Sequence, residues 1–208
     1  MTTQESIRLP YPFPQTAFDT PRLSLREYRH SDAYALHAIF SDPGVMNYWS
    51  TPPHTSTDQT KVWLRRTLDS SNNGTTDFII TLRGTNIAIG KVGLWRLLPD
   101  PSTLGSDPNT LCPTLSSPEA GELGFMLGQE YTRYGYMSEA LGVLLPYYFE
   151  RLGLVRVIAD VDPRNLPARS LLVKVGFEEK GYRKETFVVG GRLVDSVDYV
   201  LERHVWQL

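Results

Sequence analysis

A single glycine stands between two tyrosines in TRYGYMSEA, residues 132–140, where a strand-like pattern gives way to a helix-like one. The first turn of a helix has unpaired N–H groups and carries a partial positive charge. A loop that ends at Gly135 can place those groups against a phosphate, because no side chain intervenes. Glycines also occur in ordinary strand-to-helix connections. The residues alone therefore leave open a phosphate-binding loop and a structural connector.

The segments on either side of this loop predict a strand, a helix and a second strand. GELGFML alternates as a strand does over 121–127, and VRVIADV does so over 155–161. Between them, an apolar stripe predicts a helix over about 136–152, which Pro146 should kink. A unit of this length fits a right-handed parallel crossover.

The rest of the chain alternates between strand-like and helix-like patterns. The predicted elements are strand 22–28, a helix that begins at Ser31 or Asp32 and extends to Phe40, helix 58–68, strands 77–83 and 86–95, helix 166–175, and strands 182–189 and 192–201. Residues 1–17 are interpreted as an N-terminal arm and the proline-rich segment 96–120 as a loop insertion. The pattern predicts one α/β (α+β) domain over 18–208. Its central sheet is expected to be mixed and mostly antiparallel, with one parallel βαβ crossover and helices on both faces.

The composition narrows the partners that the protein can have. The 208 residues carry a formal net charge of −2, which argues against a nucleic-acid partner held by bulk electrostatics. Cys112 is the only cysteine and the four histidines have no ligand-like spacing, so neither a disulfide nor a metal site is expected. No apolar run reaches the roughly 18–20 residues of a membrane span, and the start does not resemble a signal peptide. We therefore expect a cytoplasmic protein.

Several stretches, in order, resemble one known family. TRYGYMSEA resembles the acyl-CoA pyrophosphate loop of the GNAT acetyltransferases, written Q/R-x-x-G-x-G/A. TPRLSLREYRHSDAYAL and SDPGVMNYW resemble the opening of the RimJ/RimL-like branch, the ribosomal-protein N-acetyltransferases. NLPARSLLVKVGF, residues 165–177, resembles the family's N-x-x-[SA] segment that ends in K-x-G-F. The resemblance covers the chain from about residue 20 onward. It implies an acyltransferase with acetyl-CoA as cosubstrate and no metal.

The resemblance also implies contacts with the cofactor. The residues that would surround the pyrophosphate are Thr132, Arg133, Tyr134, Gly135, Tyr136, Met137 and Ser138. Ser138 could instead act as a hydroxyl at the start of the helix, and Tyr136 could be a core residue. A backbone N–H around Leu127 would stabilise the oxyanion of the tetrahedral intermediate. Asn165 would contact the CoA arm, and it is also a candidate N-cap of the following helix. Lys174 could reach a CoA phosphate, or be an ordinary exposed helical lysine.

Three positions depart from the family pattern. Thr132 stands where Gln or Arg is usual, but it still offers a backbone N–H and a hydroxyl. Met137 stands where Gly or Ala is usual, so its side chain is expected to turn into the core. Leu172 replaces a tyrosine that many members use as a general acid, which leaves that role unassigned. Glu139, in the first helical turn, would repel a pyrophosphate, so we expect it to point away in a structural role.

The implied reaction is direct attack of a primary amine on the thioester in a ternary complex. A free aliphatic amine has a pKa near ~10 and must lose a proton before it attacks, so a base is required. Glu122 is the first candidate for this base and Asp160, on strand 155–161, is the second. A salt bridge at the start of the strand is the structural alternative for Glu122. No covalent intermediate is expected, because Cys112 lies outside the motifs.

The acceptor is less determined by the sequence. Tyr48 and Trp49 belong to a segment that lies on the substrate side in the family, and they could contact an amine from a small molecule or a peptide. A non-catalytic acyl-CoA-binding or regulatory domain is the competing function. The sequence leaves a monomer and a homodimer equally open.

Overall fold

The computed structural model describes residues 17–70, 76–98 and 120–206. The strands are β1 (Ala17–Asp19), β2 (Leu23–Arg26), β3 (Thr76–Leu82), β4 (Ala88–Leu98), β5 (Ala120–Leu127), β6 (Arg156–Val161), β7 (Glu178–Val189) and β8 (Arg192–Glu202). The α-helices are α1 (Ala33–Phe40), α2 (Pro43–Met46), α3 (Thr57–Ser70), α4 (Tyr136–Pro146), α5 (Leu166–Lys174) and α6 (Arg203–Trp206). Short helical turns are η1 (His30–Asp32), η4 (Gln129–Tyr131) and η5 (Tyr147–Arg151).

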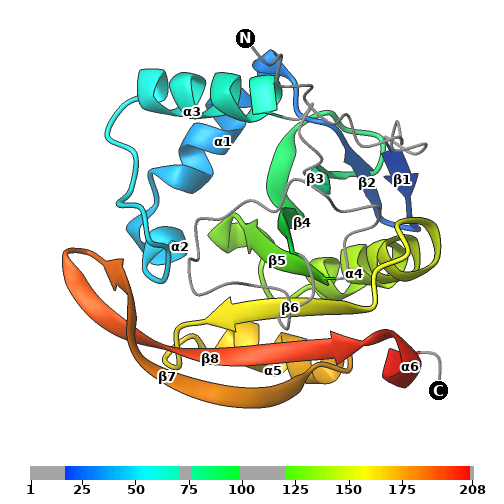
Figure 1. Ribbon diagram of the computed structural model, residues 1–208. Coiled ribbons are helices and arrows are strands. Elements are labelled where there is room, and N and C mark those ends of the chain that lie inside the picture. The colour runs from blue at the N-terminus through cyan, green and yellow to red at the C-terminus, as the bar shows by residue number, and fades with distance from the viewer. Residues whose placement is uncertain (1–16, 71–75, 99–119, 207–208) are drawn as a thin grey trace, which may run out of the picture.

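The described strands form one sheet in the order β1-β2-β3-β4-β5-β6-β8-β7 (Figure 1). Within these residues, β5 and β6 are the one parallel pair, and every other neighbouring pair is antiparallel. Helix α4 connects the parallel strands, as a crossover must. The predicted fold class, a mixed and mostly antiparallel sheet with one βαβ crossover, is confirmed.

Helices cover both faces of the sheet because successive residues of a buried strand point in opposite directions. Ile80 belongs to an apolar cluster that includes the inner face of α4, whereas its neighbour Ile79 belongs to a second cluster with α1 and α3. Both side chains are fully buried. The central strands therefore have two apolar faces, as expected of a sheet between helical layers.

The parallel strands part soon after they meet. Their register covers three residue pairs and ends at Glu122 opposite Ile158, although β5 continues to Leu127 and β6 to Val161. On its other edge β5 stays paired with β4 through Leu127. The separation leaves one edge of β5 without a β6 partner along residues 123–127.

The unpaired edge of β5 presents specific backbone groups. The Gly128 N–H donates to the Ile89 carbonyl at 2.9 Å, so this opposite pair is hydrogen-bonded. Hydrogen-bonded and non-hydrogen-bonded pairs alternate along antiparallel strands. Leu127, opposite Gly90, is therefore in a non-hydrogen-bonded pair, and its N–H points away from β4 toward the gap beside β6.

Several predicted boundaries were wrong. Strand β1 was not predicted and includes Ala17, the last residue of the expected arm, because three residues with only Phe18 buried give no periodic signal. Strand β4 extends to Leu98 and β5 begins at Ala120, so both strands take residues from the expected insertion 96–120. The other predicted residues of the insertion and of the arm, 99–119 and 1–16, lie outside the described part of the chain.

Three further boundaries differ for local reasons. The short helix α2 was not predicted, and Asp42 caps it by accepting a hydrogen bond from Gly44 N–H at 2.7 Å. Strand β7 begins at Glu178, four residues early, because its first residues are exposed and lack alternation. The long helix predicted over 136–152 changes at Pro146 from α-helix into the π-helical turn η5, consistent with a proline that cannot supply an N–H.

Candidate active site

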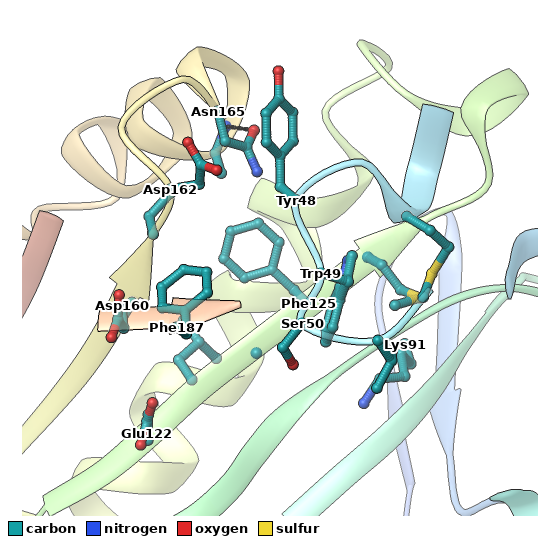
Figure 2. Close-up of a pocket in the computed structure, with 18 of the residues that line it drawn as sticks. Tyr48, Trp49, Ser50, Lys91, Glu122, Phe125, Asp160, Asp162, Asn165 and Phe187 are labelled. Carbon is teal, nitrogen blue, oxygen red and sulfur yellow. Dashed lines mark hydrogen bonds between the residues drawn. The ribbon is translucent and has the colours of Figure 1, made fainter. Parts of the chain in front are cut away.

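A cavity of about 630 Å³ opens where β5 and β6 part (Figure 2). It is bounded by the loop after α2, by β4, β5 and β6, and by β7. Figure 2 shows Glu122 and Asp160 at one side of this cavity and Lys91 at the other, with Phe125 and Trp49 between them. The predicted site residues that line it are Tyr48, Trp49, Glu122, Asp160 and Asn165.

The two candidate bases lie on the same face of neighbouring strands. Glu122 is opposite Ile158, and Asp160 is two residues further along β6, so the alternation of side chains places both carboxylates on one face. Both line the cavity, and Glu122 is half-buried. The tertiary structure therefore brings together two carboxylates that are 38 positions apart in the sequence, a suitable pair for proton transfer at one ligand.

Asp160 is held in an ion-pair cluster with residues of the β7–β8 hairpin. Arg183 Nη2 lies 2.7 Å from Asp160 Oδ2 and 2.6 Å from Asp198 Oδ1. Burial raises the pKa of Asp160 above its usual value, although the Arg183 guanidinium opposes this rise. The two aspartates hold the pKa of Arg183 above its own usual range. Because Asp160 is already paired with a cation, a bound amine would have to compete for its proton-accepting oxygen.

The opposite side of the cavity has a buried charge pair inside an aromatic wall. Lys91 Nζ lies 2.6 Å from Asp77 Oδ2, and both side chains are about one tenth exposed or less. The Tyr28 hydroxyl donates to the same Asp77 oxygen at 2.8 Å. The ammonium also lies over the rings of Trp49 and Trp63, at 5.9 and 5.6 Å from their centroids. Lys91 therefore holds Trp49 in place as part of the cavity wall.

The loop after α2 and the start of α5 together form the rim of the cavity. Asn165 caps α5 by accepting a hydrogen bond from Ala168 N–H at 3.2 Å, which confirms its structural role. Asp162 binds the neighbouring Arg164, whose guanidinium lies 5.9 Å from the centre of the Tyr48 ring. Hydrogen bonds from Arg164 are the main reason that the pKa of Asp162 is low. Tyr48 and Asn165 thus face each other across the rim (Figure 2).

The loop before α4 lies beyond the cavity, at the far end of β5. Gly135 is the N-cap of α4 with φ 80° and ψ 8°, a left-handed conformation that glycine adopts without strain. The first backbone bond of the helix joins the Glu139 N–H to the Gly135 carbonyl at 3.0 Å. The N–H groups of residues 136–138 therefore have no acceptor within the helix. Backbone geometry alone therefore favours glycine here, whatever the loop binds, although Arg133 in the same loop adopts φ 68° without being a glycine.

The other loop residues differ in how far their side chains are buried. Thr132, Arg133 and Tyr134 are exposed, and the Thr132 hydroxyl donates to the Gln129 carbonyl at 2.8 Å. Met137 is buried in the first apolar cluster, as predicted for a side chain too large to face a phosphate. The half-buried residues of this group are Tyr136 and Ser138.

The far end of α5 carries Lys174, which is exposed. Leu172, which the resemblance placed where many family members have a tyrosine, is fully buried in the apolar core and does not line the cavity. No proton donor is therefore supplied to the cavity from this position.

Comparison with known proteins identifies the family. The model of the GNAT acetyltransferase domain matches residues 22–178, which is most of the chain. The chain belongs to the GNAT acetyltransferase family. An uncharacterized N-acetyltransferase, p20, of Bacillus licheniformis is 30% identical over 179 residues, which cover 85% of this chain and 90% of p20.

Ribosomal-protein acetyltransferases are among the proteins that resemble this GNAT chain. The ribosomal protein uS5-alanine N-acetyltransferase of Escherichia coli is 32% identical over 84 residues, 40% of this chain and 43% of that protein. A solved structure of RimL, a ribosomal alpha-N-protein acetyltransferase, in complex with coenzyme A has a TM-score of 0.72 at 18% identity. It covers 88% of this chain and 95% of that one. The match to the uS5-alanine N-acetyltransferase supports the RimJ/RimL-like branch, and the likeness to RimL shows the fold. Membership of the GNAT family makes the chain an acyltransferase.

Residues 17–70, 76–98 and 120–206 contain no cluster of three or more His, Cys, Asp or Glu side chains that could hold a metal ion. No helix in these ranges is long and apolar enough to cross a membrane.

The sequence interpretation missed several residues of the candidate site. Phe125 and Phe187 line the cavity between the two candidate bases and the aromatic wall, but apolar residues on strands carry no functional signal of their own. A lysine within the apolar strand AIGKVGLW was a usable signal for Lys91, because a charge on a buried strand needs a partner. The strongest omission is Arg22, which contacts the loop before α4.

Proposed function

We propose that this acyltransferase transfers the acetyl group of acetyl-CoA to a primary amine bound in the cavity beside Glu122. The observation that carries the proposal is the separation of β5 from β6 directly after Glu122, next to the cavity. The edge of β5 that has no β6 partner suits an extended cosubstrate, which can lie along it. The two carboxylates in the same cavity suit an amine, which must lose a proton before it attacks.

The proposed cosubstrate path follows β5 from the helix to the cavity. The pyrophosphate is expected at the N-terminal end of α4, where the N–H groups of residues 136–138 have no acceptor within the helix and the helix dipole favours an anion. The arm of CoA would then run along the open edge of β5. There the Leu127 N–H, directed toward the gap, is available as a donor to the cosubstrate. Asn165 and Lys174 are proposed contacts on the α5 side.

In the proposed reaction, Glu122 accepts a proton from the ammonium form of the acceptor, either directly or through water. The free amine attacks the thioester carbonyl and a C–N bond forms. The C–S bond then breaks to release the thiolate of CoA, and the second proton of the attacking nitrogen passes through water to that thiolate. An ordinary alkyl thiol has a pKa near ~8.5, so the thiolate can leave at neutral pH without a strong acid. This agrees with the buried position of Leu172.

The lining of the cavity favours an acceptor that is cationic and partly apolar. Carboxylates outnumber cations among its charged lining residues, which are Asp77, Lys91, Glu122, Asp160, Asp162 and Arg183. Such a site attracts an ammonium group before it loses its proton. The aromatic side chains of Trp49, Phe125 and Phe187 would pack against the rest of the acceptor. A peptide N-terminus and a small amine both have this chemistry, and the RimL-like relatives make the peptide the first acceptor to test.

A continuous assay of released thiol tests the proposal. Acetyl-CoA is supplied with a panel of short peptides that begin in Ala, Ser or Met, and with small mono- and polyamines. Turnover with any member, lost in Glu122→Gln while calorimetric binding of acetyl-CoA persists, supports the proposal. Binding without turnover across the panel indicates a non-catalytic acyl-CoA-binding protein. If saturating acetyl-CoA neither shifts the melting temperature nor binds by calorimetry, the proposal fails.

A further inference from the structure

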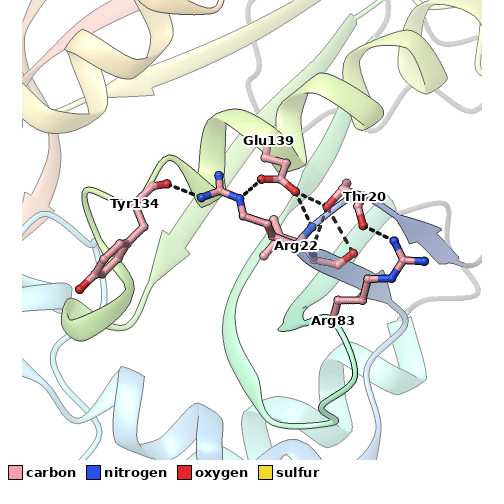
Figure 3. Close-up of polar contacts among 6 residues, drawn as sticks. Thr20, Arg22, Arg83, Tyr134 and Glu139 are labelled. Atoms are coloured by element: carbon pink, nitrogen blue, oxygen red, sulfur yellow. Dashed lines mark hydrogen bonds and ion pairs between the residues drawn. The ribbon is translucent and has the colours of Figure 1, made fainter.

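The guanidinium of Arg22 reaches from the start of β2 to the loop before α4 (Figure 3). Its Nη1 donates to the Tyr134 carbonyl at 2.9 Å, and its Nε donates to Glu139 Oε2 at 2.6 Å. The same group lies over the Tyr136 ring, with Cζ 4.8 Å from the centroid. A single side chain thus contacts both the loop and the first turn of the helix, more than 110 positions away in the sequence.

Hydrogen bonds in the turn before β2 fix the backbone on either side of Arg22. The Thr20 N–H donates to the Leu23 carbonyl and the Leu23 N–H donates to Thr20 Oγ1, both at 2.9 Å, which closes a tight turn. Glu139 Oε1 accepts from the Thr20 hydroxyl at 2.6 Å and from the Arg22 backbone N–H at 2.9 Å. We call Thr20, Arg22 and Glu139 the Arg22 clamp.

The contact with the Tyr134 carbonyl sets the orientation of one peptide group. In a planar trans peptide the carbonyl and the N–H point in opposite directions. Because Arg22 holds the Tyr134 carbonyl toward β2, the N–H of Gly135 in the same peptide points away from β2. This N–H adjoins the first-turn N–H groups of α4 that have no acceptor in the helix. The clamp therefore decides which way the loop presents its donors.

We propose that Arg22 is a positioning residue for coenzyme A, which holds the loop so that its N–H groups converge on the pyrophosphate. This inference rests on the proposed function. A preorganised loop binds more tightly because it loses less freedom when the ligand arrives. Arg22 acts through the Tyr134 carbonyl and Glu139, and it also neutralises the one carboxylate of the first turn that would repel an anion.

A general stabilising role would give a different result. The Arg22 side chain is 48% exposed, and exposed ion pairs add little to global stability. Removing Arg22 should therefore change CoA affinity while the protein remains folded. Arg83 offers a matched control, because its exposed side chain donates to the Thr20 carbonyl at 2.9 Å in the same turn and lies on the far side of Thr20 from Tyr134 (Figure 3).

The experiment is calorimetric titration of CoA into the wild type, Arg22→Gln, Arg22→Lys and Arg83→Gln, with melting temperatures for each. We expect Arg22→Gln to raise the Kd of CoA about tenfold or more, as for loss of charge-assisted hydrogen bonds, and Arg83→Gln to change it less than about twofold. Arg22→Lys should lie between them, because an ammonium keeps the charge and lacks the planar fork. In steady-state assays, Arg22→Gln should raise the KM of acetyl-CoA by a larger factor than it changes kcat.

Variants of Glu139 separate positioning from direct phosphate binding. If Arg22 works through the clamp, Glu139→Gln weakens CoA binding, and Arg22→Gln with Glu139→Gln is no worse than Arg22→Gln alone. If Glu139→Gln tightens binding, Arg22 is a phosphate ligand that Glu139 restrains, and the inference is overturned. Equal Kd values for Arg22→Gln and Arg83→Gln overturn it as well while the proposed function stands. If the wild type does not bind CoA, both the inference about Arg22 and the proposed function fail.

Discussion

The loop before α4 and the cavity beside Glu122 are built in opposite ways. The loop is made of consecutive residues, 132–139, whose geometry depends on one left-handed glycine and on the Arg22 clamp. The cavity is lined by side chains from helices α1, α2, α3 and α5, from strands β3 to β7, and from the loops after α2 and β6. The difference teaches that the loop proposed for the cosubstrate takes its donors from one short stretch and is oriented by a few distant residues, whereas the cavity proposed for the acceptor depends throughout on how distant segments pack.

The largest effect should come from the catalytic end of the cavity. Glu122→Gln is expected to lower kcat by about 10²-fold or more, the usual range for loss of a general base, while the Kd of acetyl-CoA is unchanged. Asp160→Asn is the matched control, and its smaller effect follows from the ion pair with Arg183. Steady-state thiol release measures both. A greater loss in Asp160→Asn would exchange the roles of the two carboxylates.

The next largest effect should come from the loop. Gly135→Val forces a β-branched residue into φ 80°, so the loop must rearrange and the Kd of acetyl-CoA should rise more than about tenfold. The fold should lose only about 1–2 kcal/mol, the cost of one strained residue. Gly142→Ala, in the same helix and with open space at its β-carbon, is the control and should not weaken binding. Calorimetry and thermal unfolding measure the two quantities, and unchanged binding would make TRYGYMSEA a simple connector.

The aromatic wall should affect the acceptor and leave the cosubstrate unaffected. Trp49→Ala removes apolar area from the cavity and should raise the acceptor KM about tenfold, with the Kd of acetyl-CoA unchanged. Tyr34→Ala is the control, because Tyr34 is 72% exposed and does not line the cavity. A parallel loss of acetyl-CoA affinity would show that Trp49 contacts the cosubstrate as well as the acceptor.

The smallest effect is the pH dependence of the clamp. Burial would raise the pKa of Glu139, but the hydrogen bonds from Thr20 and Arg22 outweigh it and hold the pKa below 4.5. A lowered carboxyl pKa stabilises the fold above about pH 4.5 and loses this effect as the pH falls through the folded-state value. The melting temperatures of the wild type and Glu139→Gln should therefore differ by about 2–4 °C at most near neutral pH and converge in acid. A difference that grows in acid would contradict the ion pair.

Much of the fold could be predicted because its signals are local. Alternation identified β5 and β6, and the apolar stripe identified α4, including the burial of Met137. The prediction of strand boundaries failed where buried and exposed residues do not alternate. The first residues of β7 are exposed and β1 is short, so pairing with a neighbouring strand alone defines both. Glu139 was expected to have a structural role, and its contacts with Thr20 and Arg22 agree with this.

The sequence by itself determined the family, the order of the elements and the position of the glycine loop, because each depends on residues that are near one another in the chain. Only the tertiary structure decided that Asp160 is paired with Arg183, that Lys91 and Asp77 support the aromatic wall, and that Arg22 holds the loop. Contacts between distant residues produce no periodic pattern in the sequence. Each charged residue could have paired with any other group of opposite charge, so the sequence does not say which pair forms. For Gly135, the structure adds a physical reason: φ 80° favours glycine before any ligand is considered.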